Sequence, residues 1–319
     1  MAIENREPFR VGFLLIDGFA LMSYASALEP LRVANLKAGA ELYRIDHIGL
    51  SPASSSAGVM VGQTMGFDDT PDLDMVLVVA GGDPMRYDNR RTFRWLRRVA
   101  RRPIIVGGVS GGPVILAKSG IMNGRRMTVH WEHAAPLSEA VPSVIVERTL
   151  YVVEKDRMTC AGGTAPLDMM HAFLSDRHGA GFARAVSDWL LHTETRRSFD
   201  PQRAGLTERY GTTSEPVIEA IEAMESHISD PLTLEQLSAI ARVGQRHLNR
   251  LFREKLGRPT MNFYRDLRLE AAQDLLRQST LTVTEIALAT GFAGSAHFSQ
   301  SFKSLYGVSP SAARRRPVS

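Results

Sequence analysis

The segment 107–113, GGVSGGP, holds residues suited to covalent chemistry. Its central five residues match the pattern G-x-S-x-G, in which a sharp strand-to-helix turn exposes the hydroxyl of Ser110. The backbone N–H groups of Gly111 and Gly112 would then lie at a helix N-terminus, where they can bind an anion or an oxyanion. His130 follows in the sequence and could serve as a base. This pattern allows a hydrolase or amidase with Ser110 as its nucleophile.

Two features argue against catalysis by Ser110. In hydrolases with this turn an acidic residue lies between the serine and the histidine, but residues 111–129 contain no Asp or Glu. A serine hydroxyl also has a far higher pKa than a thiol and needs a positioned base. Cys160 belongs to a different segment and does not supply the thiol.

A second kind of chemistry is suggested by His130 and His133, which form an H-x-x-H pattern. Two histidines at this spacing can contribute to a metal site, but a third ligand is not evident. We therefore expect neither a metal ion nor another cofactor.

Apolar runs alternate with helical patterns through residues 10–190. The runs are apolar on both faces and bounded by Gly, Pro or Asp, as buried parallel strands are. The predicted strands are 11–16, 75–80, 103–109, 127–131 and 158–163, and the predicted helices are 20–38, 90–101 and 164–178. This alternation predicts an α/β domain with a doubly wound, mostly parallel, flavodoxin-like sheet.

The composition changes after residue 194. Residues 195–216 are polar, contain Gly and Pro, and have weak periodicity, so we interpret them as a linker. Beyond Pro216 the pattern is purely helical. A chain of 319 residues is long for a single core. We therefore predict two domains, 1–194 and 217–319, of which the second is all-α.

Two segments of the second domain, 234–252 and 283–302, resemble each other. Each combines a short apolar helix, a turn centred on Gly244 or Gly291, and a second, amphipathic helix. This is the plan of a helix-turn-helix unit, whose second helix enters the major groove of DNA. We predict two such units, at 234–255 and 283–304. A generic helical bundle with a solvated polar face is the alternative.

Helical spacing predicts which residues of the two recognition helices face outward. If Leu248 and Phe252 face the core, the outward set in the first unit is Arg246, Asn249 and Arg250, with His247 near the edge. The corresponding set in the second unit is Ser295, Ala296, His297 and Gln300. Arginine can read guanine and asparagine can read adenine. The second set is shorter and less charged, so we expect it to position the protein more than to read bases.

Charge is unevenly distributed along the chain. Residues 231–319 contain 13 Lys+Arg and 6 Asp+Glu, a net of +7, whereas the remainder has a net of −3. A basic end on a mildly acidic body is typical of a nucleic-acid-binding domain attached to another domain. A single cysteine, no secretory pattern at the N-terminus and no apolar run of ~18 residues predict a cytoplasmic protein that does not enter a membrane.

The stretch 217–316 resembles the DNA-binding domain of the AraC/XylS family of bacterial transcription regulators. The resemblance is carried by LNRLFREKLGRPTMNFYRDLRLEAAQDLL and EIALATGFAGSAHFSQSFKSLYGVSPSAAR. It implies that a long helix, 260–277, joins the two units, and that both recognition helices meet one face of DNA in successive major grooves. Two residues depart from the pattern: Gly244 stands where a serine often caps the helix, and Ala296 is too small to hydrogen-bond a base.

Residues 10–190 resemble the class I glutamine-amidotransferase-like superfamily, which includes the PfpI-type proteins. The supporting stretches are VGFLLIDGFALMSYASALEPLR, GVSGGPVILAKSGIMNGRRMTVHW and AGGTAPLDMM. Catalytic members have a cysteine where this chain has Ser110, and a supporting glutamate where it has Ser23. His130 does match the family's histidine. The resemblance therefore implies a site that has lost two of its three functional groups.

Together, the two resemblances imply a bacterial regulator whose first domain is a dimerising sensor of a small metabolite. The implied ligand pocket is lined by Ser23, Tyr24, Ser110, Gly111, Gly112, His130 and Trp131. Some members of this group respond to quaternary amines and others to amino acids. Trp131, Tyr24 and Phe19 could form an aromatic wall for a methylammonium group.

The sequence thus predicts a transcription regulator, not an enzyme, that activates a catabolic operon as a homodimer. Its predicted partners are double-stranded DNA, a small nitrogenous effector and a second copy of the chain. Two alternatives remain open at this point. One is an enzyme that uses Ser110 and carries a DNA-binding domain, and the other is a purely structural dimerisation domain without a ligand.

Overall fold

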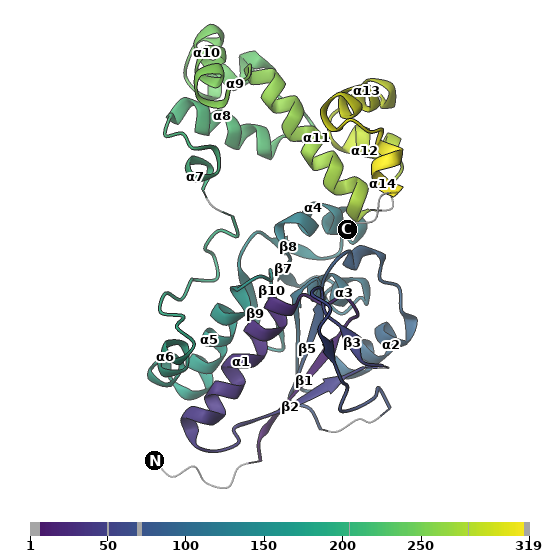
Figure 1. Cartoon of the computed structure of the whole chain (residues 1–319), viewed down its shortest axis with the longest axis vertical. Helices are drawn as coiled ribbons and strands as arrows, with labels where there is room; N and C mark the ends of the chain where they lie inside the picture. Colours follow the sequence, from purple (N-terminus) through teal and green to yellow (C-terminus); the bar gives the residue numbers. More distant parts are fainter. Residues whose placement is uncertain (1–6, 50, 69–71, 204, 280, 316–319) are drawn as a thin grey trace. The chain divides into compact units, whose positions relative to one another are not determined.

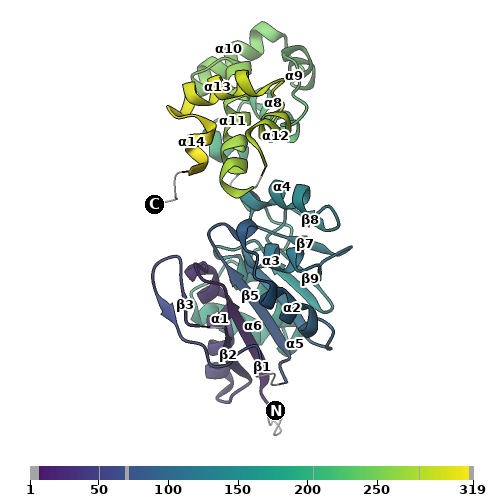
Figure 2. The same cartoon turned by 90° about the vertical axis from the view of Figure 1, so that its right-hand side faces the viewer.

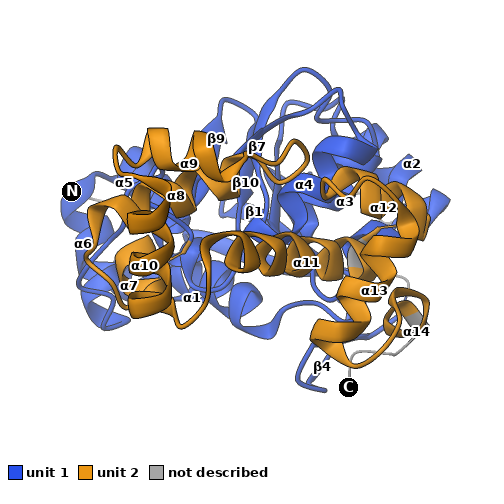
Figure 3. Ribbon diagram, turned by 90° about the horizontal axis from the view of Figure 1, so that it is seen from above, with its two compact units in different colours: residues 1–202 blue, residues 203–319 orange. Residues whose placement is uncertain are grey.

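The computed structural model of the chain describes residues 7–49, 51–68, 72–203, 205–279 and 281–315. These residues form two compact units, with the boundary between Gln202 and Arg203 (Figure 3). We call them unit 1 and unit 2 and describe each by itself.

Unit 1 is built on a six-stranded sheet (Figure 1). Its strands, in spatial order, are β2 (Tyr43–Ile48), β1 (Phe9–Leu15), β5 (Met75–Ala80), β6 (Ile105–Ser110), β10 (Arg157–Cys160) and β9 (Tyr151–Glu154). The first five are parallel, and β9 pairs antiparallel with β10. The predicted doubly wound, mostly parallel sheet is confirmed, and the runs 11–16, 75–80 and 103–109 correspond to β1, β5 and β6, three of its four interior strands.

Helices cover both faces of this sheet (Figures 1 and 2). One core contains side chains of α1 (Leu21–Ala38), α5 (Ala165–His178) and α6 (Ala180–Trp189). The other contains side chains of α2 (Arg90–Val99), α3 (Gly112–Lys118) and α4 (Trp131–Ala140). Successive strand residues alternate between these cores because strand side chains point to opposite faces. In β5, Leu77 belongs to the first core and Val78 to the second.

Smaller elements complete unit 1. A two-stranded antiparallel pair joins β3 (Ala53–Ser54) to β4 (Met60–Val61), and a parallel pair joins β7 (Arg126–Thr128) to β8 (Ile145–Glu147). A 3₁₀ turn spans Pro84–Arg86. The prediction of a strand over 127–131 is wrong at its end, because β7 stops at Thr128 and the side chain of His130 caps the next helix.

Unit 2 is helical throughout the part that the structure describes. Its elements are α7 (Leu206–Tyr210), α8 (Glu215–Ser226), α9 (Leu234–Ile240), α10 (Gln245–Leu256), α11 (Thr260–Gln278), α12 (Val283–Ala289), α13 (Ser295–Tyr306) and α14 (Pro310–Arg315). They form two separate apolar cores, one around α8, α9 and α10 and one around α12 and α13. The long helix α11 contributes to both cores (Figure 3).

The stretch 195–216, which we interpret as a linker, is divided between the two units. Gln202 Nε2 donates to the carbonyl oxygen of Thr149, in unit 1, at 2.7 Å. Leu206 and Tyr210, on α7, pack against the first core of unit 2. None of the described helices has the length and apolar character needed to cross a membrane.

A substitution at Gly112 tests the close packing of α3 against the sheet. A Cβ atom there would lie 1.9 Å from the carbonyl oxygen of Val78, a backbone atom that cannot easily move. We expect Gly112→Ala to lower the free energy of unfolding by about 3 kcal/mol, measured by urea denaturation of the full chain. Gly181→Ala, where a Cβ meets nothing within 4 Å, is the matched control and should not destabilise the protein. Equal stability of the two variants would contradict this packing.

Candidate ligand pocket and nucleic-acid interface

Ser110 ends β6 in a strained backbone conformation. Its φ of 59° lies in the left-handed region, which residues with a side chain rarely adopt. The side chain is partly exposed. Gly162 approaches so closely that a Cβ there would lie 3.0 Å from Ser110 Oγ. The structure thus contains the sharp turn that the G-x-S-x-G pattern predicts, with the loop after β10 directly against it.

The helix that follows Ser110 offers less to an anion than the sequence suggests. The N–H of Gly111 donates to the carbonyl oxygen of Ala80 at 3.0 Å, because the pairing of β5 with β6 continues to this point. Pro113 has no N–H. The expectation that Gly111 and Gly112 would both present their amides is therefore wrong for Gly111.

Two residues of the predicted aromatic wall, Phe19 and Tyr24, pack in the core of unit 1. Phe19 is completely buried, and its ring lies 5.3 Å from that of Tyr24 in an edge-on contact. Tyr24 Oη and His47 Nε2 form a hydrogen bond of 2.6 Å. Burial raises the pKa of Tyr24 to about 12 and lowers the pKa of His47, so both groups are neutral near pH 7. Tyr24 and Phe19 are committed to the core around α1, where Ser23 is also buried.

Aromatic residues gather at the start of α4. His130 Nδ1 accepts a hydrogen bond of 3.4 Å from the backbone N–H of Glu132 and so caps the helix. The His130 ring lies 5.3 Å from that of Trp131 and 5.9 Å from that of His133. Among the described residues, no group of three or more His, Cys, Asp or Glu side chains could hold a metal ion.

Cys160 does not replace the missing thiol. It is completely buried in β10, and burial raises the pKa of its thiol to about 12. The thiolate, which is the reactive form, is therefore almost absent at neutral pH.

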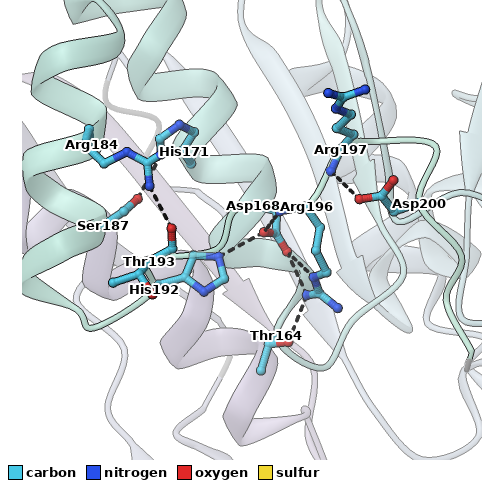
Figure 4. Close-up of polar contacts among 10 residues, drawn as sticks. All are labelled: Thr164, Asp168, His171, Arg184, Ser187, His192, Thr193, Arg196, Arg197 and Asp200. Carbon is cyan, nitrogen blue, oxygen red and sulfur yellow. Dashed lines mark hydrogen bonds and ion pairs between the residues drawn. The ribbon is translucent and has the colours of Figure 1, made fainter.

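A polar network that the sequence did not reveal holds the segment by which the chain leaves unit 1 (Figure 4). The side chain of Asp168, on α5, is fully buried. Its Oδ1 accepts from His192 Nε2 at 2.9 Å and from the backbone N–H of Arg196 at 2.8 Å. Its Oδ2 accepts from Arg196 Nε at 3.0 Å and Nη2 at 2.7 Å. Arg196 also donates to Thr164 Oγ1 at 2.9 Å, two residues beyond the glycine that abuts Ser110.

The same exit segment, residues 192–202, is also bound at its end. Gln202 Nε2 donates to Thr128 Oγ1 and to the carbonyl oxygens of Val129 and Thr149, at 3.1, 3.0 and 2.7 Å. Val129 directly precedes His130. The exit segment is therefore hydrogen-bonded within two residues of both Gly162 and His130. The sequence signal for this network is Asp168, which stands among apolar residues in the first half of the predicted helix 164–178.

A cleft of about 520 Å³ lies apart from these residues, on the outer side of α2. It is lined by Phe67, Asp68, Arg91, Arg94, Trp95, Arg97, Arg98 and Arg101. No predicted site residue is among them, so the volume of this cleft gives no support to the predicted pocket.

In unit 2 the repeat in the sequence is a repeat in structure. Thr233 and Gln236 form a capping box at the start of α9, and Thr282 and Glu285 form one at the start of α12. Such boxes satisfy N–H groups that the first helical turn leaves unpaired. The first helix of each helix-turn-helix unit therefore begins at a fixed residue.

The turns of the two helix-turn-helix units differ in length by one residue. The residue with positive φ is Arg242, at 52°, in the first unit and Gly291, at 72°, in the second. Gly244 instead caps the N-terminus of α10, as Gly294 does for α13. The second turn is one residue longer, so the offset between the repeats is 49 residues before the turn and 50 after it. The prediction that the two turns centre on Gly244 and Gly291 therefore names residues at different places in the two turns.

Most of the predicted DNA-facing residues are exposed. On α10 these are Arg246, His247 and Arg250, and on α13 they are Ala296, His297 and Gln300, with Ser295 partly exposed. Arg250 Nη2 lies 3.2 Å from His247 Nδ1. The predicted outward set of α10 thus presents two guanidinium groups, Arg253 adds a third exposed one on the same helix, and α13 contains no arginine.

Asn249 is the exception, because its side chain turns away from the outward face. Its Oδ1 accepts from the backbone N–H of Thr260 at 3.0 Å, at the start of α11. The residue that precedes α11 is Pro259, whose side chain has no acceptor for this N–H. In the second unit the corresponding helix begins with Pro310, which has no N–H to satisfy. The expectation that Asn249 faces outward is wrong, since it caps a helix.

Comparison with known proteins finds matches for both units. Residues 9–176 match the model of the DJ-1/PfpI family, and residues 237–316 match the model of a helix-turn-helix domain. The HTH-type transcriptional regulator GlxA of Rhizobium meliloti is 44% identical over 318 residues, which cover 98% of this chain and 98% of that protein. The HTH-type transcriptional regulator CdhR of Pseudomonas aeruginosa is 37% identical over 301 residues, 94% of this chain and 89% of that protein.

A solved structure extends the likeness to the fold. The crystal structure of an AraC family transcriptional regulator from Pseudomonas putida matches with a TM-score of 0.52 and 24% sequence identity. The match covers 57% of this chain and 100% of that one. At this identity it shows a shared fold and nothing finer.

The role of Asn249 can be tested by removing its side-chain acceptor. We expect Asn249→Ala to lower the free energy of unfolding by about 1 kcal/mol, the usual effect of losing a helix cap. Thermal and urea denaturation of the full chain measure this. Arg246→Ala, on the exposed face, is the control and should change stability by less than about 0.5 kcal/mol. If Asn249→Ala left stability unchanged but altered the base preference, the capping role would be wrong and Asn249 would be a base-reading residue.

Proposed function

Because this chain belongs to the AraC-type helix-turn-helix regulators that carry a DJ-1/PfpI domain, we propose that it is a homodimeric, ligand-responsive activator of transcription. The observation that carries this proposal is the set of exposed arginines on α10, in a helix-turn-helix unit whose first helix begins with a capping box. A second unit with the same capping box contains α13. Exposed arginines on a recognition helix are suited to bidentate contacts with guanine. A regulator that acts on DNA in this way belongs in the bacterial cytoplasm.

We assign different tasks to the two recognition helices. Arg246, Arg250 and His247 are the proposed base readers. On α13, His297 and Gln300 contribute weaker contacts, while Ala296 and Ser295 lie close to the DNA without a long side chain to reach a base edge. Base contacts specify sequence and phosphate contacts fix register. We therefore propose that the first unit carries most of the sequence preference.

The proposed effector site lies at the turn that carries Ser110. The hydroxyl of the partly exposed Ser110, the amide of Gly112, and the rings of His130 and Trp131 are groups suited to a small molecule with a carboxylate and a cationic nitrogen. Such molecules include quaternary amines and amino acids. With Tyr24 and Phe19 engaged elsewhere, Trp131 is the aromatic residue that we propose for contact with the cation.

The exit segment supplies a physical connection for ligand control. Arg196 binds Thr164, beside the loop that abuts Ser110, and Gln202 binds the carbonyl oxygen next to His130. A ligand that displaces either loop therefore changes the partners of the segment that leads to unit 2. A ligand shifts a conformational equilibrium only through such differential contacts.

One observation favours a second function. The strained φ of Ser110 is the geometry of a nucleophile held at a sharp turn, and such strain is common at active sites. The second candidate is therefore a hydrolase or amidase that uses Ser110. The same substitution distinguishes it from the sensor, as described below.

Arg250→Ala tests the first recognition helix. We expect the affinity for the chain's own promoter region to fall by ~1–3 kcal/mol and the preference at one base position to relax, measured by gel shift and footprinting. Arg148→Ala removes the same charge from an exposed site in unit 1 and serves as the control. Unchanged binding by Arg250→Ala would show that the assigned face of α10 is wrong.

Titration with glycine betaine, carnitine, choline and arginine tests the effector class. A ligand present at a hundred times its Kd should stabilise the protein by about 2.7 kcal/mol, which thermal-shift measurements detect. Ser110→Ala should alter this response while DNA affinity without ligand stays unchanged. A response to none of the four compounds contradicts the effector class. Turnover of a substrate that Ser110→Ala abolishes would instead support the enzyme.

A further inference from the structure

The two helix-turn-helix units have separate apolar cores, so their relative orientation depends on what connects them. The first core contains Leu237, Leu248 and Phe252, and the second contains Ile286, Phe298 and Phe302. The long helix α11 contributes to both. What holds the units at one angle must therefore lie on α11 or where the units touch.

Tyr264, on α11, binds the first helix-turn-helix unit. Its side chain is almost fully buried, and its Oη donates to the carbonyl oxygen of His227 and accepts from the N–H of Leu232 at 3.3 Å. His227 and Leu232 lie at the ends of the loop between α8 and α9. Tyr264 therefore fixes this loop, residues 227–232, to α11.

Arg268 lies one helical turn after Tyr264 and binds the second unit. Its Nη1 donates to the carbonyl oxygen of Gly291 at 2.8 Å. Its guanidinium carbon lies 4.4 Å from the ring centre of Phe292 and 5.7 Å from that of Tyr264. Burial lowers the pKa of Arg268 from its ordinary value. The guanidinium is thus partly removed from water. It contacts Tyr264, which binds the first helix-turn-helix unit, and Phe292, which belongs to the second.

The loop and the turn also touch each other directly. A Cβ on Gly291 would lie 2.4 Å from Pro231 Cγ and 2.8 Å from the carbonyl oxygen of Ile228. Only glycine fits here, since its positive φ of 72° also disfavours a side chain. The turn of the second unit is therefore pressed against loop 227–232 of the first, next to Arg268.

One further contact leads from Arg268 to the recognition helix. The ring of Phe292 lies 5.7 Å from that of His297 and 5.3 Å from that of Phe298. His297 is exposed in the first turn of α13, and Phe298 anchors that helix to its core. Moving Phe292 would therefore move the start of α13.

We propose that Arg268 is a positioning residue that sets the distance and angle between the recognition helices α10 and α13, and that the protein consequently reads the spacing between its two major-groove contacts. This rests on the proposed binding of both helices to DNA. One base pair inserted between the contacts moves them apart by about 3.4 Å and rotates them by roughly a tenth of a turn. A rigid pair of helices cannot follow this change, whereas a loosened pair can.

The experiment uses the full chain and a DNA duplex enriched from a random pool by the wild-type protein. Footprinting locates the two groove contacts, and one or two base pairs are then inserted between them. We expect the wild type to lose at least about 30-fold in affinity on one insertion, the equivalent of about 2 kcal/mol. Arg268→Met keeps the length and apolar stem of the side chain but removes the donor and the charge, and should lose less than about 5-fold.

Arg265→Met is the matched control. Arg265 lies on the same helix, is partly exposed, and pairs with the adjacent Asp266 at 2.9 Å. This variant should keep the wild-type dependence on spacing. A loss of affinity by Arg268→Met that is equal on all duplexes would indicate a merely structural role and overturn the proposal, as would unchanged dependence on spacing.

A second variant covers the case in which Arg268→Met does not fold, which circular dichroism would reveal. Tyr264→Phe removes only the hydroxyl that binds loop 227–232, and should also relax the dependence on spacing. If Tyr264→Phe keeps the full dependence, the proposal is wrong. If the wild type enriches no duplex at all, the DNA-binding function itself fails and the inference fails with it.

Discussion

The carboxylate of Asp168 has no contact with solvent, and a charge in such a place requires partners. Both of its oxygens are satisfied by residues of the exit segment, His192 and Arg196. Removing one partner of a buried pair strands the other, which is far more costly than losing an exposed ion pair. The path of the chain out of unit 1 is therefore determined by one buried side chain on α5, close to the loop that abuts Ser110.

The turn at Ser110 combines the strained geometry of a nucleophile elbow with a hydroxyl at its tip. The missing Cβ atom at position 112 lets α3 approach β5, and the missing Cβ atom at position 162 lets the loop after β10 approach Ser110 at the end of β6. Backbone packing thus maintains the turn whichever residue occupies its tip. With a hydroxyl there, and with Cys160 buried and its pKa raised to about 12, the described residues offer no reactive thiol.

Patterns of burial were predictable from the sequence, whereas hydrogen bonds were not. The strands β1, β5 and β6 are continuous apolar runs and were predicted from that pattern, but β2 includes Arg44, Asp46 and His47 and gives no such signal. The outward face of α10 followed from helical spacing, except at Asn249. Its side chain caps another helix by accepting from Thr260, eleven residues further along the sequence. That bond depends on Pro259, which has no side-chain acceptor of its own. The same holds for Asp168, whose partners lie more than twenty residues beyond it.

These cases share a physical basis that bears on control. Within each core, apolar contacts are numerous, individually weak and non-directional. Where one part of the chain must be held at a set angle, the contacts are few, polar and directional, as at Asp168 with Arg196 and at Arg268 with Gly291. A typical hydrogen bond contributes only about 1 kcal/mol net to stability, although it specifies geometry closely. The free energy of binding a small molecule is large enough to exchange the partners in such polar contacts. The apolar cores on either side then stay folded.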